Sequence, residues 1–275
     1  MTLQYPADRQ SSRPVGYLRA SFLLAVLLCP LLLQAGTSPW QDKRYIERSF
    51  YDIALNAEYR SERVPPVVKR WMRPLRVWMY SGSGDSDAQR SLLKDHLRTL
   101  GEIARLSVRL VDDRRNANVK VFFASERELE HLVRREMPST ALKQLPHSQC
   151  LGSIRFNKKS EITGGTVVIP VERAKASGKL EPCIVEEVTQ MLGLINDSRF
   201  ARDTVFSDDT QDERLTGLDY LLIKLLYSPH IEPGMSLREA MPAVRRQLDN
   251  WDRVGYFQRV QKHLSDEYGA DAVDG

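Results

Sequence analysis

The sequence contains few of the residues that most often hold transition metals. Its 275 residues include five histidines and three cysteines, and no two histidines stand within one helical turn of each other. The short spacing between His147 and Cys150 supplies only two of the three or four ligands that a zinc site uses. We therefore expect no bound metal and no cofactor.

A strong excess of basic charge is also missing. Lysine and arginine together number 40 against 36 acidic residues, which leaves a formal net charge of +4. Nucleic-acid-binding domains usually carry a concentrated basic face, so no nucleic-acid partner is expected. Hydrophobic residues make up 42% of the chain, which indicates a folded core.

No hydrophobic run reaches the roughly 20 residues of a usual membrane-spanning helix. The longest run, Phe22–Leu33, follows a basic leader and is typical of an export signal. We predict a signal peptide over residues 1–35, with cleavage after Ala35, and a periplasmic or secreted protein. The alternative is an inner-membrane anchor formed by residues 22–33, which would then be the chain's membrane contact.

The rest of the chain is predicted to contain one domain. Residues 36–74 form an N-terminal arm, with a short helix and a proline break, that lies on the domain. Residues 75–264 form the domain, and residues 265–275 form an acidic, flexible tail. After loss of the signal, two cysteines remain, Cys150 and Cys183. In an oxidising compartment an even pair favours a disulfide between them.

Hydrophobic periodicity predicts alternating strands and helices in this domain. Strands are expected at residues 75–80, 106–111, 119–123, 153–156 and 166–169, and helices at about 86–105, after Ser125, at 183–192, after Thr216 and at 236–251. Ser125 with Glu128, and Thr216 with Asp219, have the spacing of N-terminal capping motifs. This order favours an α+β fold with a mixed sheet and long helices.

The stretch from Cys183 to Asp197 is the most informative part of the sequence. Helical spacing places Ile184, Val188 and Met191 on one hydrophobic face. Glu186 and Gln190 stand one turn apart on another face, with Glu187 about 100° round from Glu186. Gly193 is expected to end the helix, and Asn196 and Asp197 follow it.

This spacing resembles the H-E-x-x-H-x-x-G-x-x-H pattern of the metzincin metallopeptidases, in which the glutamate is the general base and the histidines bind zinc. Aligned on that pattern, Glu186, Gln190 and Asn196 replace the three histidines, whereas Glu187 and Gly193 match. The segment C-I-V-E-E-V-T-Q-M-L-G-L-I-N-D also resembles the sequences of an uncharacterised bacterial family, domain-of-unknown-function family 2927. We know no assigned activity for that family.

The resemblance implies a zincin-like fold. In such a fold the strand at 153–156 would be the edge that lines a cleft, and the helix within Leu215–Leu226 would lie behind the site. The methionine turn would fall near 204–207, with Phe206 in place of methionine, or at Met235 after that helix. The neutral amides of Gln190 and Asn196 are poor substitutes for imidazole at zinc. Together with Glu186 and Asp197 they would form an oxygen set, which suits calcium or magnesium better.

Three functions follow from this pattern. The favoured one is a non-catalytic envelope protein that binds an extended peptide or another envelope protein through the cleft beside Glu186–Asn196. The second is a hydrolase that uses Glu187 as general base, either without metal or with an oxygen-ligated cation. The third is a purely structural envelope component.

Overall fold

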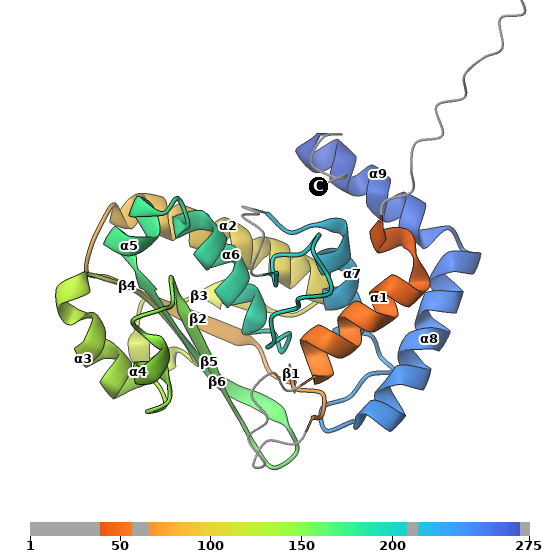
Figure 1. Ribbon diagram of the computed structural model, residues 1–275, viewed down its shortest axis with the longest axis horizontal. Helices are drawn as coiled ribbons and strands as arrows, with labels where there is room; N and C mark the ends of the chain where they lie inside the picture. The colour runs from red at the N-terminus through yellow and green to blue at the C-terminus, as the bar shows by residue number, and fades with distance from the viewer. Residues whose placement is uncertain (1–38, 57–65, 208–213, 270–275) are drawn as a thin grey trace, which may run out of the picture. The chain divides into compact units, whose positions relative to one another are not determined.

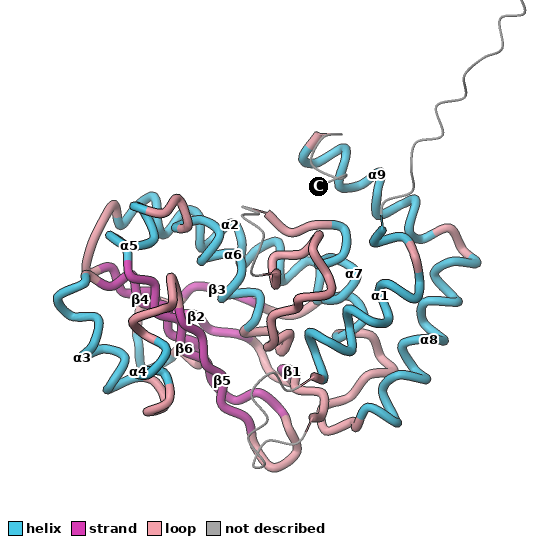
Figure 2. The backbone as a smooth tube through the Cα atoms, viewed as in Figure 1, coloured by secondary structure: helices cyan, strands magenta, loops and turns pink. Residues whose placement is uncertain are grey.

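One mixed sheet organises the described part of the chain, which comprises residues 39–56, 66–207 and 214–269 of the computed structural model (Figures 1 and 2). Its six strands are β1 (Arg70–Trp71), β2 (Leu75–Ser81), β3 (Val108–Leu110), β4 (Val119–Ala124), β5 (Leu151–Phe156) and β6 (Glu161–Pro170). The order is β1-β6-β4-β2-β3 with parallel neighbours, and β5 pairs antiparallel with β6. The predicted mixed sheet is confirmed.

Helices and single turns connect and cover the strands. They are η1 (Pro39–Gln41), α1 (Lys43–Phe50), η2 (Tyr51–Leu55), α2 (Ser86–Ala104), η3 (Arg114–Asn116), α3 (Glu126–Glu136), α4 (Ala141–Gln144), α5 (Val171–Ala176), α6 (Leu180–Gln190), α7 (Gly217–Leu226), α8 (Leu237–Arg253) and α9 (Tyr256–Tyr268).

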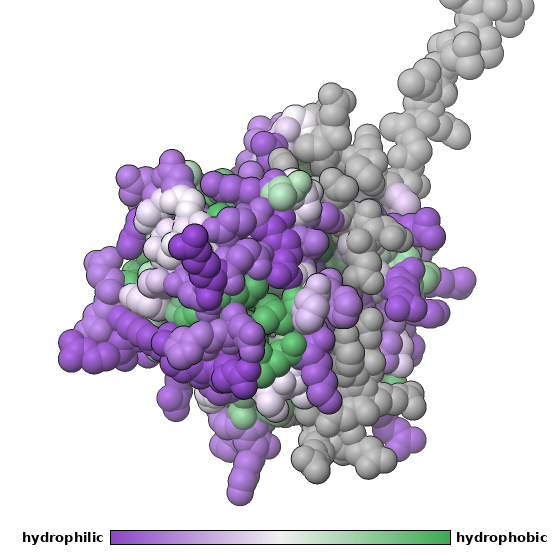
Figure 3. All heavy atoms as spheres, turned by 60° about the vertical axis from the view of Figure 1, so that its left-hand side comes forward, coloured by the Kyte–Doolittle hydropathy of each residue, from purple (hydrophilic) through white to green (hydrophobic). Residues whose placement is uncertain are grey.

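The two faces of the sheet bury separate hydrophobic clusters. Because successive strand residues point to opposite faces, Val77 of β2 and Val121 of β4 join the larger cluster, which includes buried residues of α2, α6, α7 and α8. Phe122 of β4 joins the smaller cluster under α3 and α4. In Figure 3, which turns the side carrying α3 toward the viewer, hydrophobic side chains gather in a hollow surrounded by hydrophilic ones.

The capping predictions are confirmed at two helices. Ser125 and Glu128 form a reciprocal capping box at the start of α3, and Thr216 and Asp219 form one at the start of α7. Such boxes satisfy backbone N–H groups that have no partner within the helix. At α2, which was expected from about residue 86, the Asp85 side chain accepts the capping hydrogen bonds from the N–H groups of Asp87 and Ala88.

Several elements differ from the sequence-based expectation. Periodicity did not predict β1, α4 or α5, which have two, four and six residues. It also missed α9, which continues past residue 265, where the flexible tail was expected to begin, to Tyr268. Within the predicted arm, Trp40 and Phe50 are buried in the same cluster as the sheet.

The predicted signal peptide and its cleavage position lie outside the described residues. Among the helices of the described ranges, none has the length and hydrophobicity needed to cross a membrane.

Candidate functional site

Glu187 is the central residue of the candidate site. It lies on α6, which packs against β5 and β6, and only 6% of its surface is exposed. Its Oε2 atom has no hydrogen-bond partner within the described structure. A buried polar atom without a partner costs about 1–3 kcal/mol, so this carboxyl group requires a physical or functional explanation.

Two glycines of the sheet make space for this face of α6. A β-carbon placed on Gly152 of β5 would lie 2.2 Å from Glu187 Oε2 and 3.0 Å from the Met191 methyl carbon. A β-carbon on Gly165 of β6 would lie 2.7 Å from the Met191 sulfur. Gly152 itself is exposed. The Glu187 carboxyl group therefore lies directly beneath an exposed backbone position of β5.

The surroundings of Glu187 favour its neutral form. Burial raises the pKa of Glu187 well above its usual value, and the negative charges of Glu186 and Asp197 raise this pKa further. Glu186 is half-buried and influences Glu187 through its charge. A protonated carboxylic acid can donate a hydrogen bond as well as accept one. Glu187 is thus suited to binding a carbonyl group or to transferring a proton.

The residues after α6 form a turn that is fixed to the rest of the protein. Gln190 Nε2 donates to Asp197 Oδ1 at 2.8 Å. The backbone N–H and the side-chain Nδ2 of Asn196 both donate to the carbonyl of Ile53, at 3.1 and 2.9 Å. Gln190 and Asp197 therefore lie together, while the Asn196 amide is engaged by the N-terminal segment.

Gly193 is required by two features of this turn. Its φ angle is +117°, which residues with a β-carbon rarely adopt. A β-carbon there would also lie 2.0 Å from the carbonyl oxygen of Lys69. The predicted role of this glycine in ending the helix agrees with its position three residues after Gln190.

Aromatic donors satisfy the carbonyl groups at the C-terminal end of α6. Trp71 Nε1 donates to the Met191 carbonyl at 2.7 Å, and the Tyr227 hydroxyl donates to the Leu192 carbonyl at 2.9 Å. The Arg70 guanidinium lies 4.9 Å from the centre of the Tyr227 ring. These contacts hold the end of α6 against β1 and the residue after α7. Sequence reasoning did not identify them because the partners are far apart in the chain.

A second polar contact fixes the opposite face of α6. The Thr189 hydroxyl donates to the Val185 carbonyl at 2.6 Å and lies 2.9 Å from His96 Nε2 of α2. Because the hydroxyl hydrogen is used by Val185, the imidazole is assigned as the donor through Nε2–H. Burial lowers the pKa of His96 to about 4. His96 is therefore neutral at physiological pH, and its role is to pack α2 against α6.

The turn at 204–207 lies against α7 and the segment after α6. Asp219 of α7 is fully buried and accepts hydrogen bonds from the Thr204 hydroxyl, the Val205 N–H and Thr216. Burial raises the pKa of Asp219 to about 6, although these hydrogen bonds lower it. Phe206 is buried, and its carbonyl accepts from the N–H of Ser198 at 2.8 Å.

The predicted disulfide is confirmed. Cys150 and Cys183 are bonded, with their Cα atoms 5.8 Å apart. The bond joins the residue before β5 to the first half of α6. It also means that Cys150 cannot act with the exposed His147 as a metal ligand.

The other predicted ligand positions are Glu186, Gln190, Asn196 and Asp197. They do not belong to a cluster of metal-binding side chains in the described structure. Within residues 39–56, 66–207 and 214–269, no group of three or more histidine, cysteine, aspartate or glutamate side chains is arranged to hold a metal ion. Three hollows on the described surface are lined by other residues, between α1 and α8, beside β3 and η3, and between α2, α7 and α9.

Comparison with known proteins identifies a family without an assigned activity. The family model described as protein of unknown function (DUF2927) matches residues 43–246, which include every element from α1 to the middle of α8. A comparison with curated proteins gives no match. The chain therefore belongs to the DUF2927 family.

Proposed function

We propose that this chain is an exported, zincin-like protein without zinc ligands that binds an extended peptide or a segment of an envelope protein beside β5 and α6. The observation that carries the proposal is the buried Glu187 carboxyl group beneath the exposed Gly152 of an edge strand. The zincin-like frame is supported by the position of β5, which pairs with β6 alone in the described sheet, since the resemblance implies that this strand is an edge.

Strand addition is the binding mode that β5 favours. In an antiparallel pair, alternate residues direct their N–H and C=O groups away from the partner strand. An edge strand such as β5 therefore offers main-chain hydrogen bonds to an incoming extended peptide. Over most of β5 the side chains are small or only half-buried, including Gly152, Ser153 and Ile154. Because Gly152 has no side chain, its exposure is exposure of the main chain.

Glu187 supplies the selective element in this proposal. A neutral carboxylic acid beneath Gly152 can exchange hydrogen bonds with an amide group of a ligand. When such a ligand binds, the Glu187 Oε2 atom gains the hydrogen-bond partner that it lacks among the described residues. Export is supported by the Cys150–Cys183 disulfide, because such bonds persist in oxidising compartments.

A hydrolase is the second candidate, and the raised pKa of Glu187 favours it. General acids and bases work best when their pKa lies near the operating pH, and burial is a common way to raise a glutamate to that range. In this version the ionised form of Glu187, which becomes populated only as pH approaches its raised pKa, would take a proton from the attacking water. An oxygen-ligated cation, if present, would lie near Glu186 and Asp197.

The binding proposal is tested by selecting peptides from a displayed library and measuring their affinity by fluorescence anisotropy. Peptides that bind by strand addition should lose at least about tenfold in affinity when alternate backbone amides are N-methylated, because main-chain hydrogen bonds are removed. The Gly152→Ala variant should bind more weakly, since its β-carbon displaces the Glu187 carboxyl group.

The matched control is Gly178→Ala, at an exposed position outside the sheet where the new β-carbon would meet no atom within 4 Å, and its affinity should be unchanged. Unchanged affinity in Gly152→Ala, or insensitivity to N-methylation, contradicts strand addition at β5. Cleavage of the selected peptides that is lost in Glu187→Gln, with the fold intact, supports the hydrolase instead.

A further inference from the structure

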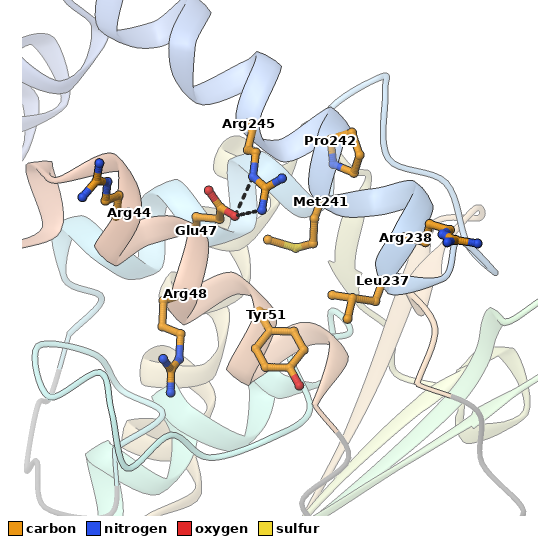
Figure 4. A pocket seen from close by; sticks show the side chains of 9 residues that line it. All are labelled: Arg44, Glu47, Arg48, Tyr51, Leu237, Arg238, Met241, Pro242 and Arg245. Atoms are coloured by element: carbon orange, nitrogen blue, oxygen red, sulfur yellow. Dashed lines mark hydrogen bonds and ion pairs between the residues drawn. The ribbon is translucent and has the colours of Figure 1, made fainter.

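A groove between α1 and α8 has no part in the proposed function. It has a volume of about 690 Å³ and is lined by residues of α1 and α8 and by Tyr51, rather than by the sheet. Figure 4 shows the side chains that line it: Arg44, Glu47, Arg48, Tyr51, Leu237, Arg238, Met241, Pro242 and Arg245.

The floor of the groove is hydrophobic. Leu237 and Met241 extend from α8 into the space between the helices, and Tyr51 lies opposite them at the end of α1 (Figure 4). Met241 is buried, but 41% of the Leu237 surface is exposed. An exposed leucine beside an aromatic ring in a concave site is suited to contact a hydrophobic side chain of a ligand.

The rim of the groove is strongly basic. Glu47 is its one acidic lining residue, and its carboxylate pairs with Arg245 at 2.6 Å. The Arg48 guanidinium lies 4.8 Å from the centre of the Phe200 ring. Arg44 and Arg238, at opposite ends of the view in Figure 4, form no ion pair with any described residue. Three guanidinium groups therefore retain charge available to an anion.

The backbone of α8 adds a hydrogen-bond acceptor. Pro242 has no N–H, so it cannot donate to the carbonyl of Arg238 one turn earlier in the helix. A peptide carries both carboxylates for the arginines and N–H groups for such an acceptor.

We propose that this groove binds an acidic segment of a partner protein, with one hydrophobic side chain on Tyr51, Leu237 and Met241 and carboxylates on Arg44, Arg48 and Arg238. Arginine pairs with carboxylates through two parallel hydrogen bonds and combines with aromatic residues at the energetic centres of protein interfaces. The concave shape favours an inserted side chain over the flat surface of an anionic membrane.

Selection from a random displayed-peptide library against the purified protein tests the proposal. We expect a population of peptides rich in aspartate and glutamate around leucine, isoleucine or phenylalanine. Their affinity should fall at least about tenfold in Arg44→Glu/Arg238→Glu and should fall as salt is raised. The methyl carbon resonance of Met241 should shift on binding.

The control variant Arg246→Glu/Arg253→Glu makes the same change in net charge at exposed positions of α8 outside the groove. The proposal is overturned if no acidic peptides are enriched or if both variants weaken binding equally. It is also overturned if phosphatidylglycerol vesicles bind through Arg44 and Arg238 while the peptides do not. Gly152→Ala should leave this binding unchanged, which separates it from the site at β5.

Discussion

Replacing Glu187 with glutamine should change the pH dependence of stability in a defined direction. Glutamine has nearly the same shape as a protonated glutamic acid but does not ionise. In wild type, burial and the charges of Glu186 and Asp197 raise the pKa of Glu187. In the unfolded chain this side chain ionises at its ordinary pKa of about 4.3.

The sign of the effect follows from proton binding. Between the unfolded and folded pKa values, the unfolded chain has released the Glu187 proton and the folded protein retains it. The contribution of Glu187 to stability is therefore fully present below about pH 4.3 and is lost as pH rises toward the folded pKa. The loss reaches about 1.4 kcal/mol per pH unit within this range.

Urea unfolding of wild type and Glu187→Gln between about pH 4 and pH 8 measures this effect. Other groups titrate in the same range, so the informative quantity is the difference in unfolding free energy between the two proteins. We expect this difference to move in favour of Glu187→Gln as pH rises and to level off above the folded pKa. Glu130→Gln, at an exposed glutamate that pairs with Arg134, should show a difference that varies by less than about 0.5 kcal/mol.

A flat difference curve for Glu187→Gln would show that the carboxyl group ionises normally in the folded protein. A difference that moves in favour of wild type with rising pH would show that the ionised form is stabilised. Either result refutes the assignment of a neutral, buried acid beneath β5.

Three further predictions concern the frame around the site. Reduction of the Cys150–Cys183 bond should lower the unfolding free energy by about 3–4 kcal/mol, as measured by urea unfolding with and without reductant. Gly193→Ala should lower the unfolding free energy by at least about 3 kcal/mol, because a positive φ combines with a clash at Lys69. Gly178→Ala, with φ +70° and open space, should lower it by about 1–2 kcal/mol. Equal losses in the two variants would contradict the clash. Asp219→Asn should gain up to roughly 3 kcal/mol relative to wild type as pH rises from about 4 to above 6, since a pKa of about 6 makes the wild-type contribution decline through this range; a pH-independent difference would contradict it.

Local patterns predicted much of the fold. The longer strands and helices follow from periodicity, and the capping boxes at Ser125 and Thr216 follow from short-range hydrogen bonds. The Cys150–Cys183 bond follows from the expectation that an exported chain with two remaining cysteines pairs them. These features depend on neighbouring residues or on composition, which the sequence displays directly.

The environment of the candidate site could not be predicted in the same way. Glu187 is buried because Gly152, on a different element, leaves space for its carboxyl group. His96 reaches Thr189 from 93 residues away, and Asn196 reaches Ile53 from 143 residues away. Such contacts depend on how elements pack, and no local pattern in the sequence specifies them. The short strand β1 is similarly defined by its pairing with β6.

Hydrogen exchange of β5 in the presence of a selected peptide tests the central proposal most directly. Strand addition predicts slower exchange of backbone amides within Leu151–Phe156, because an edge strand acquires a second hydrogen-bonded neighbour. Saturating peptide that leaves these amides unchanged while protecting another surface would contradict binding at the edge beside Glu187.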